Sequence, residues 1–171
     1  MAKKKSKKFG TSRLLVNLGL IALSLLLIFT LAMPMFSIYG ELLGRGTTEL
    51  YGATAFIGDI FNGDITNAWA IITMIVYFIT LIIALAVLVL AVLDLLGIKL
   101  NVPAKAIELL LVIFAVVLFV TSLIYAGNVG ADGSFVIGST TLAKSTMSIS
   151  WAPIIAPIAG VGCLVLKFFK K

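Results

Sequence analysis

Four long apolar stretches, separated by three more polar segments, dominate the hydrophobic pattern of the chain. The apolar stretches cover 14–36, 67–96, 106–126 and 150–168, and none alternates in the manner of a barrel strand. About 20 apolar residues in helical conformation match the roughly 30 Å of hydrocarbon in a bilayer. Because a segment in lipid must satisfy its own backbone hydrogen bonds, each stretch is predicted to be a helix. The pattern predicts an all-α integral membrane protein, a bundle of four transmembrane helices.

Composition agrees with a membrane protein. Apolar residues make up 61% of the chain and charged residues 12%, and the mean hydropathy is +1.21. Soluble domains are about 45–50% apolar and about 25% charged. The first stretch, 14–36, is longer than the roughly 7–15 apolar residues of an ordinary signal peptide. We therefore expect it to stay in the mature protein as the first span.

The distribution of lysine and arginine predicts the orientation in the membrane. Eleven of the 13 basic residues lie in the tail 1–13, the short turn 97–105 and the C-terminal segment 167–171, and the loops 37–66 and 127–149 hold only Arg45 and Lys144. The positive-inside rule then places both tails, 1–13 and 169–171, and the turn in the cytoplasm of a multi-pass plasma-membrane protein. The lysine-rich tail is expected to attract anionic membrane lipid, and no nucleic-acid partner is predicted.

The two loops on the external side carry strand and turn signals. The first contains Tyr39-Gly40 and Tyr51-Gly52 twelve residues apart, which indicates two extended segments or a compact, turn-rich cap. In the second, Ala131-Asp132-Gly133 is a turn signal before the β-prone 134–137, whose partner strand is either 139–142 or a strand of the first loop. The loops are predicted to form a small, partly β extracellular cap.

Aromatic residues of the first external loop form a candidate surface for a partner. Apolar rings outside the membrane either bind another protein or pack the cap onto the bundle. Both interpretations stay open at this point. The residues concerned are Tyr39, Tyr51, Phe56 and Phe61.

Small and hydroxyl-bearing residues mark the candidate contacts between helices, since such residues let helices approach closely in lipid. In the second stretch they form a helical stripe that Asn17 and Ser24 of the first could face. Alternatively, the stripe, or a last stretch bent at Pro153 and Pro157, lines a pore or transport site. The candidate interface residues are Ala152, Ala156, Gly160, Thr73, Tyr77 and Thr80.

Ionisable residues lie only near the cytoplasmic ends of the predicted helices. Glu108 and Lys167 fall at a similar depth and form a candidate intramembrane ion pair, for which Lys105 is the alternative partner of Glu108. Asp94 lies 25 residues after Trp69 and is expected beyond the hydrocarbon on the cytoplasmic side. The lack of a carboxylate in mid-membrane counts against a proton- or sodium-coupled carrier.

The sequence offers little for catalysis. It contains no histidine, which removes histidine-dependent acid–base, nucleophilic and metal chemistry, and its one cysteine, Cys163, cannot form an intrachain disulfide. The external acids match no calcium loop. We therefore expect no enzyme, with no catalytic residue, cofactor or metal site.

The order of segments, with a longer first loop, a shorter second loop and both tails inside, resembles the claudin and peripheral-myelin-protein type of four-span membrane protein. The external tryptophan and cysteine-pair signature of that group is missing here, so none of its residue roles is carried over. The sequence predicts a small four-span scaffold or accessory subunit that contacts other membrane proteins or copies of itself. The alternative is an oligomeric channel or transporter component for ions or small solutes.

Overall fold

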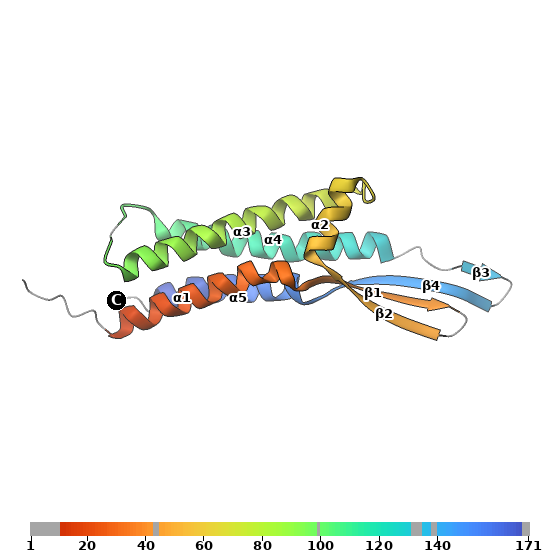
Figure 1. Cartoon of the computed structure of the whole chain (residues 1–171), viewed down its shortest axis with the longest axis horizontal. Helices are drawn as coiled ribbons and strands as arrows, with labels where there is room; N and C mark the ends of the chain where they lie inside the picture. The colour runs from red at the N-terminus through yellow and green to blue at the C-terminus, as the bar shows by residue number, and fades with distance from the viewer. Residues whose placement is uncertain (1–10, 43–44, 99, 131–134, 138–139, 169–171) are drawn as a thin grey trace, which may run out of the picture.

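A computed structural model describes residues 11–42, 45–98, 100–130, 135–137 and 140–168 of the chain. It is mostly helical, with a small sheet that extends beyond one end of a helical bundle (Figure 1). The bundle consists of α1 (Thr11–Phe29), α3 (Ala68–Leu95), α4 (Ala104–Gly130) and α5 (Trp151–Phe168). The remaining elements are η1 (Thr30–Ala32), β1 (Pro34–Leu42), β2 (Arg45–Gly52), α2 (Ala53–Asn62), β3 (Phe135–Ile137) and β4 (Thr140–Ile149).

Three helices are long and apolar enough to cross a membrane. They are Arg13–Ala32, Ala68–Leu95 and Ala104–Val129, which confirms the prediction of membrane-spanning helices for these three. The apolar part of α5, Trp151–Leu166, is shorter than the other three. The structure therefore supports three spans by length and composition.

The first span ends earlier than the hydrophobic pattern suggests. The helical segment stops at Ala32, Met33 is extended with φ −91° and ψ 153°, and β1 begins at Pro34. A residue before proline is disfavoured in the helical region, and proline itself lacks the N–H that would continue the helix. The apolar residues 34–36, which we had assigned to the first span, thus belong to the sheet.

The sheet is antiparallel and has the strand order β2-β1-β4-β3. β1 is flanked on both sides, so that Tyr39 lies opposite Thr48 of β2 and opposite Thr146 of β4. β3 pairs with β4, so of the two partners predicted for 134–137 the one in its own loop is confirmed, and β4 in turn pairs with β1 of the first loop. The two loops therefore fold together, as predicted, into one small sheet.

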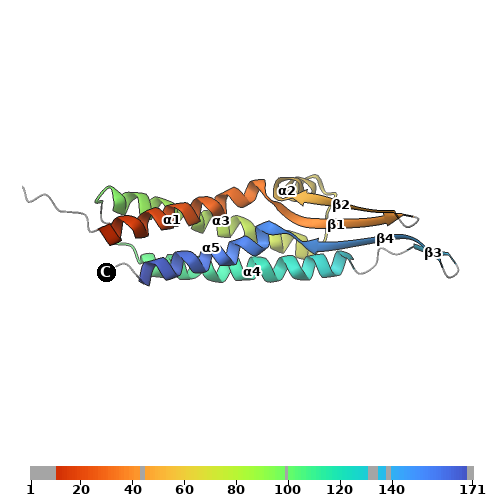
Figure 2. The same cartoon turned by 90° about the horizontal axis from the view of Figure 1, so that it is seen from below.

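Two strands of the sheet continue directly into helices of the bundle. β1 follows α1 and η1, and β4 leads into α5 (Figure 2). At this junction the Ser150 N–H donates a hydrogen bond to the Met35 carbonyl at 3.0 Å, and the Ala53 N–H donates to the Met33 carbonyl at 3.3 Å. The base of the sheet is thereby fixed to the end of the bundle.

An aromatic cluster fills the junction between the sheet and the helices. Phe36 of β1, Phe56 of α2 and Tyr125 of α4 have ring centroids 5.1 to 5.4 Å apart. Phe36 and Phe56 are fully buried. Tilted and edge-to-face rings at such distances attract one another beyond the area that they bury. The cluster holds α2 across the end of the bundle.

The helices form a ring in which α1 contacts α3 and α5, and α4 contacts α3 and α5. The interior contains apolar side chains, such as Leu20 and Leu118, together with the buried polar side chains of Asn17, Ser24 and Ser122. The outer surface carries large exposed apolar residues, such as Leu15, Ile82 and Ile158. Polar groups inside and large apolar side chains outside are expected for helices that face lipid.

Candidate functional site

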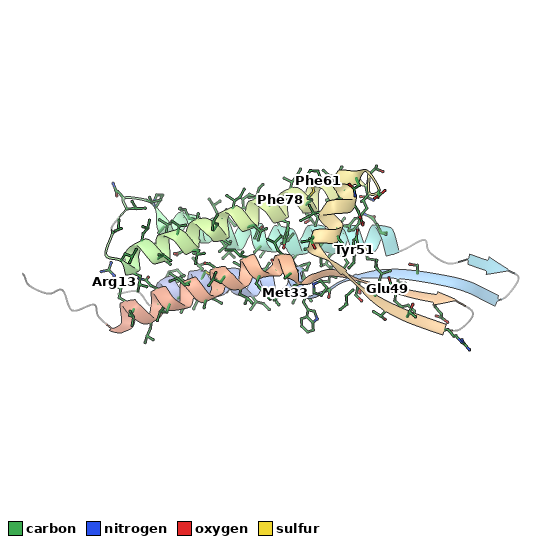
Figure 3. All side chains as sticks on the ribbon, in the orientation of Figure 1. Arg13, Met33, Glu49, Tyr51, Phe61 and Phe78 are labelled. Carbon is green, nitrogen blue, oxygen red and sulfur yellow. The ribbon has the colours of Figure 1, made fainter. Side chains whose placement is uncertain are left out.

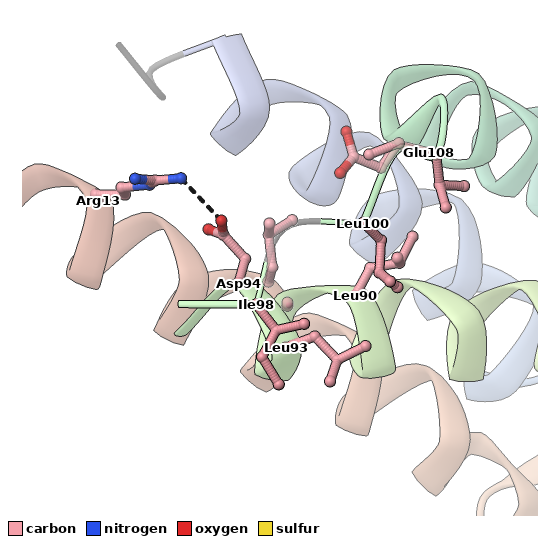
Figure 4. Close-up of a pocket in the computed structure, with 11 residues that line it drawn as sticks. Arg13, Leu90, Leu93, Asp94, Ile98, Leu100 and Glu108 are labelled. Carbon is pink, nitrogen blue, oxygen red and sulfur yellow. Dashed lines mark hydrogen bonds and ion pairs between the residues drawn. The ribbon is translucent and has the colours of Figure 1, made fainter. Parts of the chain in front are cut away.

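A charged cavity lies at the end of the bundle far from the sheet. It has a volume of about 330 Å³ and is bounded by α1, α3, α4 and the turn between α3 and α4 (Figure 4). Its charged side chains are Arg13, Asp94 and Glu108, and the other side chains that line it are apolar, including Leu90 and Leu100. Two carboxylates and one guanidinium from three helices therefore meet at one cavity.

Asp94 connects α3 to two consecutive turns of α1. Nη2 of Arg13 donates to Oδ1 of Asp94 at 2.9 Å, and Nδ2 of Asn17 donates to Oδ2 at 2.6 Å. Asn17 is fully buried, whereas the side chains of Arg13 and Asp94 are 37% and 20% exposed. Charge-assisted hydrogen bonds of this kind are stronger than neutral ones. The sequence pointed to Asn17 and Asp94 separately and missed their pairing.

Glu108 is the buried carboxylate of the cavity. It is 3% exposed, near the start of α4, on a helix that packs against α5. The side chain of Lys167, its predicted partner, lies outside the described residues, so the Glu108–Lys167 pair stays a prediction. Lys105, the alternative partner, is exposed.

The polar side chains of the cavity are two carboxylates and one guanidinium. A nucleophile would need a positioned base beside it, and the cavity lining contains neither histidine, serine nor cysteine. Within the described part of the chain, no group of three or more histidine, cysteine or acidic residues could hold a metal ion. The hydrogen bonds of Asp94 at this cavity join α1 to α3.

The hydroxyl stripe of α3 faces the interior of the bundle. Thr73, Tyr77 and Thr80 are each at most 2% exposed. The hydroxyls of Thr73 and Thr80 donate to backbone carbonyls four residues earlier, at 2.7 and 2.8 Å, while the Tyr77 hydroxyl lies 3.1 Å from the Thr30 hydroxyl at the end of α1. The structure places these groups in contacts within and between helices.

The small residues of α5 are buried, and Gly160 lies where that helix approaches α4. Ala152 and Ala156 are each 1% exposed. At Gly160 an added Cβ would lie 3.5 Å from both the Cβ of Ala115 and the Cα of Val112. A larger side chain at 160 would therefore push α5 away from α4.

The four candidate aromatic residues between the first two predicted spans differ in their exposure. Phe61 is 72% exposed and Tyr39 is 37% exposed, while Tyr51 is half-buried. Phe56 is fully buried in the aromatic cluster, so it packs α2 onto the bundle and contributes nothing to the outer surface. The prediction of a partner surface is thus corrected at Phe56, where the alternative of packing the cap holds.

Tyr51 joins β2 to α2. Its hydroxyl donates a hydrogen bond to the Asp59 carboxylate. Burial, followed by this hydrogen bond to Asp59, raises the pKa of Tyr51 above its ordinary value near 10. The contact fixes the C-terminal end of β2, where residues 51 and 52 are partly buried.

The N-terminal part of β2, residues 45–50, is an exposed edge that the sequence did not reveal. β2 stands at one end of the strand order, and residues 45–50 are all exposed. The extended segment was predictable from the first loop alone. Its position at the edge depends on β4, about 100 residues later, which takes the other side of β1.

Comparison with protein-family models, with curated proteins and with solved structures finds no significant match to the chain.

Proposed function

We propose that the chain is a small four-span membrane scaffold or accessory subunit that contacts other proteins through its outer sheet and its helix faces. The observation behind this proposal is the division of the molecule into a closely packed bundle and a projecting sheet. In Figure 3, Glu49 lies on a strand of the sheet, far from Arg13 at the other end of the molecule. The exposed strand β2 offers backbone and side-chain groups to a partner.

The fourth span of this proposal is α5. Its 18 residues correspond to about 27 Å of helix, near the thickness of the hydrocarbon. It packs along α1 and α4, and its outward side chains Ile158, Val161 and Val165 are exposed and apolar. With four spans, the positive-inside rule puts both tails in the cytoplasm and the sheet outside the plasma membrane. That order of elements is the one in which the chain resembles the claudin type.

Gentle detergent extraction of the tagged protein from its native membrane, followed by mass determination and identification of bound proteins, tests the scaffold function. A companion or further copies at fixed stoichiometry are expected. The association should weaken in Leu50→Ser, since Leu50 is 65% exposed on β2, and persist in the matched lipid-facing variant Ile82→Ser, which is 67% exposed. A wild-type protein recovered only as an unaccompanied monomer would contradict the proposal.

The charged cavity favours a second candidate, an oligomeric channel or transporter component. A solute path would have to continue from the cavity along the hydroxyl stripe of α3. Cysteine at Tyr77 or Thr80, in a Cys163→Ala background, tests this with a membrane-impermeant thiol reagent, and Thr47→Cys on the exposed part of β2 is the reactive control. We expect the buried positions to stay unlabelled, and ready labelling would favour the transport function.

A further inference from the structure

The free edge of β2 lacks three common protections against pairing with another strand, namely lysine, proline and a covering strand. Edge strands commonly carry lysine or proline, or are covered by another element. β2 has the sequence RGTTELYG, without lysine or proline, and residues 45–50 are exposed. No described strand lies on its outer side. Its outward N–H and C=O groups are therefore available to a further strand.

The charges of β2 are complementary to those of a second, reversed β2. Arg45, Thr47 and Glu49 share one face of the sheet, since successive strand residues alternate between faces. If two β2 strands pair antiparallel about Thr47, Arg45 of each copy lies opposite Glu49 of the other. Opposite charges in such cross-strand pairs stabilise the sheet, and like charges destabilise it. The strand is thus complementary to itself in one register.

A parallel pairing lacks this complementarity. Two copies in the same membrane, related by an axis along the membrane normal, would place their β2 strands parallel and at equal height. Arg45 would then lie beside Arg45 of the second copy, and Glu49 beside Glu49. The charge pattern consequently favours the antiparallel arrangement.

The direction of the strands decides where the second copy must be. β1, β2 and β4 run along the long axis of the bundle (Figures 1 and 2). Reversing β2 in the second copy therefore places its helical bundle at the opposite end of the joined sheet. From Thr47 to Gly52 each strand covers about 17 Å, so the Gly52 residues of the two copies would lie about 34 Å apart along the strands. Two membranes that face each other satisfy this geometry.

We propose that β2 edges of two copies anchored in facing membranes pair antiparallel about Thr47 and so join the membranes. This inference rests on the proposed function of the outer sheet as a contact surface, and it identifies the partner as a second copy of the chain. The contact is isologous, because each copy uses the same residues.

Charge reversal in reconstituted vesicles tests the register. The purified full chain is placed in phosphatidylcholine vesicles, and vesicle clustering is followed by light scattering. Wild-type vesicles should cluster. Arg45→Glu vesicles alone and Glu49→Arg vesicles alone should cluster at least tenfold less, because each variant opposes like charges. A mixture of the two populations should cluster again, as should vesicles of the double variant.

Disulfide trapping tests the pairing directly. Two populations of Thr47→Cys protein in a Cys163→Ala background, with tags of different size, are mixed and oxidised. A dimer that contains both tags is expected, because Thr47 of the two copies lie directly opposite. The matched control is Thr48→Cys, which lies on the other face and opposite Gly46 of the second copy, so that far less mixed dimer should form.

Three outcomes would overturn the inference. The first is vesicle clustering that is equal for the wild type and both charge-reversal variants. The second is disulfide dimers that never contain both tags. The third is an equal yield of mixed dimer from Thr47→Cys and Thr48→Cys. Dimers formed only within one population would leave the scaffold function standing, with contacts inside one membrane. If wild-type vesicles form no cluster and no dimer, and the protein extracted from its native membrane has no companion, the proposed function fails as well.

Discussion

Arg13 of α1 and Asp94 of α3 form an ion pair, with Nη2 and Oδ1 2.9 Å apart, at the end of the bundle opposite the sheet. Asn17, one turn further along α1, binds the second carboxylate oxygen. The aromatic cluster of Phe36 and Phe56 lies at the other end. Polar contacts at one end and ring packing at the other thus fix the position of α1 relative to its neighbours.

Replacing Asp94 by alanine should lower the stability of the bundle. The change removes an acceptor from both Arg13 and the fully buried Asn17, at a cost of about 1–3 kcal/mol. Thermal unfolding in detergent measures the effect, and Asp94→Asn, which retains an acceptor oxygen, should be milder. In a double-mutant cycle of Asp94→Ala with Arg13→Ala, strictly additive losses of unfolding free energy would contradict an energetic coupling between Arg13 and Asp94.

Replacing Phe56 by alanine should detach α2 from the end of the bundle. Phe56 is fully buried against Phe36 and Tyr125, and removing such a ring costs about 3–5 kcal/mol. Limited proteolysis in the 53–62 segment and thermal unfolding report the change. Phe61→Ala, in the same helix but 72% exposed, should behave like the wild type. Equal sensitivity of the two variants would argue against the cluster.

Enlarging Gly160 should disturb the contact between α4 and α5. A leucine there would meet Ala115 and Val112, and overpacking typically costs about 1–3 kcal/mol. Gly160→Ala should be tolerated, because its Cβ lies at an ordinary contact distance of 3.5 Å. The control is Gly127→Leu, where nothing lies within 4 Å. A Gly160→Leu protein that unfolds at the wild-type temperature would contradict the close approach.

The bond between Tyr51 and Asp59 predicts a dependence on alkaline pH. Because burial and this bond raise the pKa of Tyr51, the folded state favours the protonated phenol more than the unfolded state does. The resulting stability is fully present below pH 10 and is lost as the pH rises above it toward the folded pKa. Tyr51→Phe should reduce this alkaline loss in unfolding titrations. If the stability of Tyr51→Phe falls at alkaline pH as it does in the wild type, Tyr51 is not the source of the loss.

The helices were predictable from the sequence because a hydrophobic run of sufficient length has few alternatives in lipid. The polar contacts within the bundle were less predictable. The spacing of Thr73, Tyr77 and Thr80 indicated one face, yet only packing reveals that Tyr77 meets Thr30 at the end of α1. Asp94 was expected near the cytoplasmic boundary, but its partners come from a helix about 80 residues earlier.

The sheet shows the limit of local patterns most clearly. Turn and β-prone residues indicated extended segments in both loops. They did not indicate the strand pairing, in which Tyr39 lies opposite both Thr48 and the distant Thr146. Phe56 was a candidate for a partner surface because it lies close to Phe61 and other apolar residues in a loop between two predicted spans. Its burial depends on Phe36 and Tyr125, which lie on other elements.

Cysteine labelling in intact cells is the most direct test of a sheet held outside the membrane by four crossing helices. In a Cys163→Ala background, a membrane-impermeant thiol reagent should label Thr47→Cys on β2 at once. Val102→Cys, in the exposed turn between α3 and α4, and an epitope placed after residue 171 should become accessible only when the membrane is opened. Labelling of Val102→Cys in intact cells, or an epitope accessible from the same side as Thr47, would contradict the four-span arrangement.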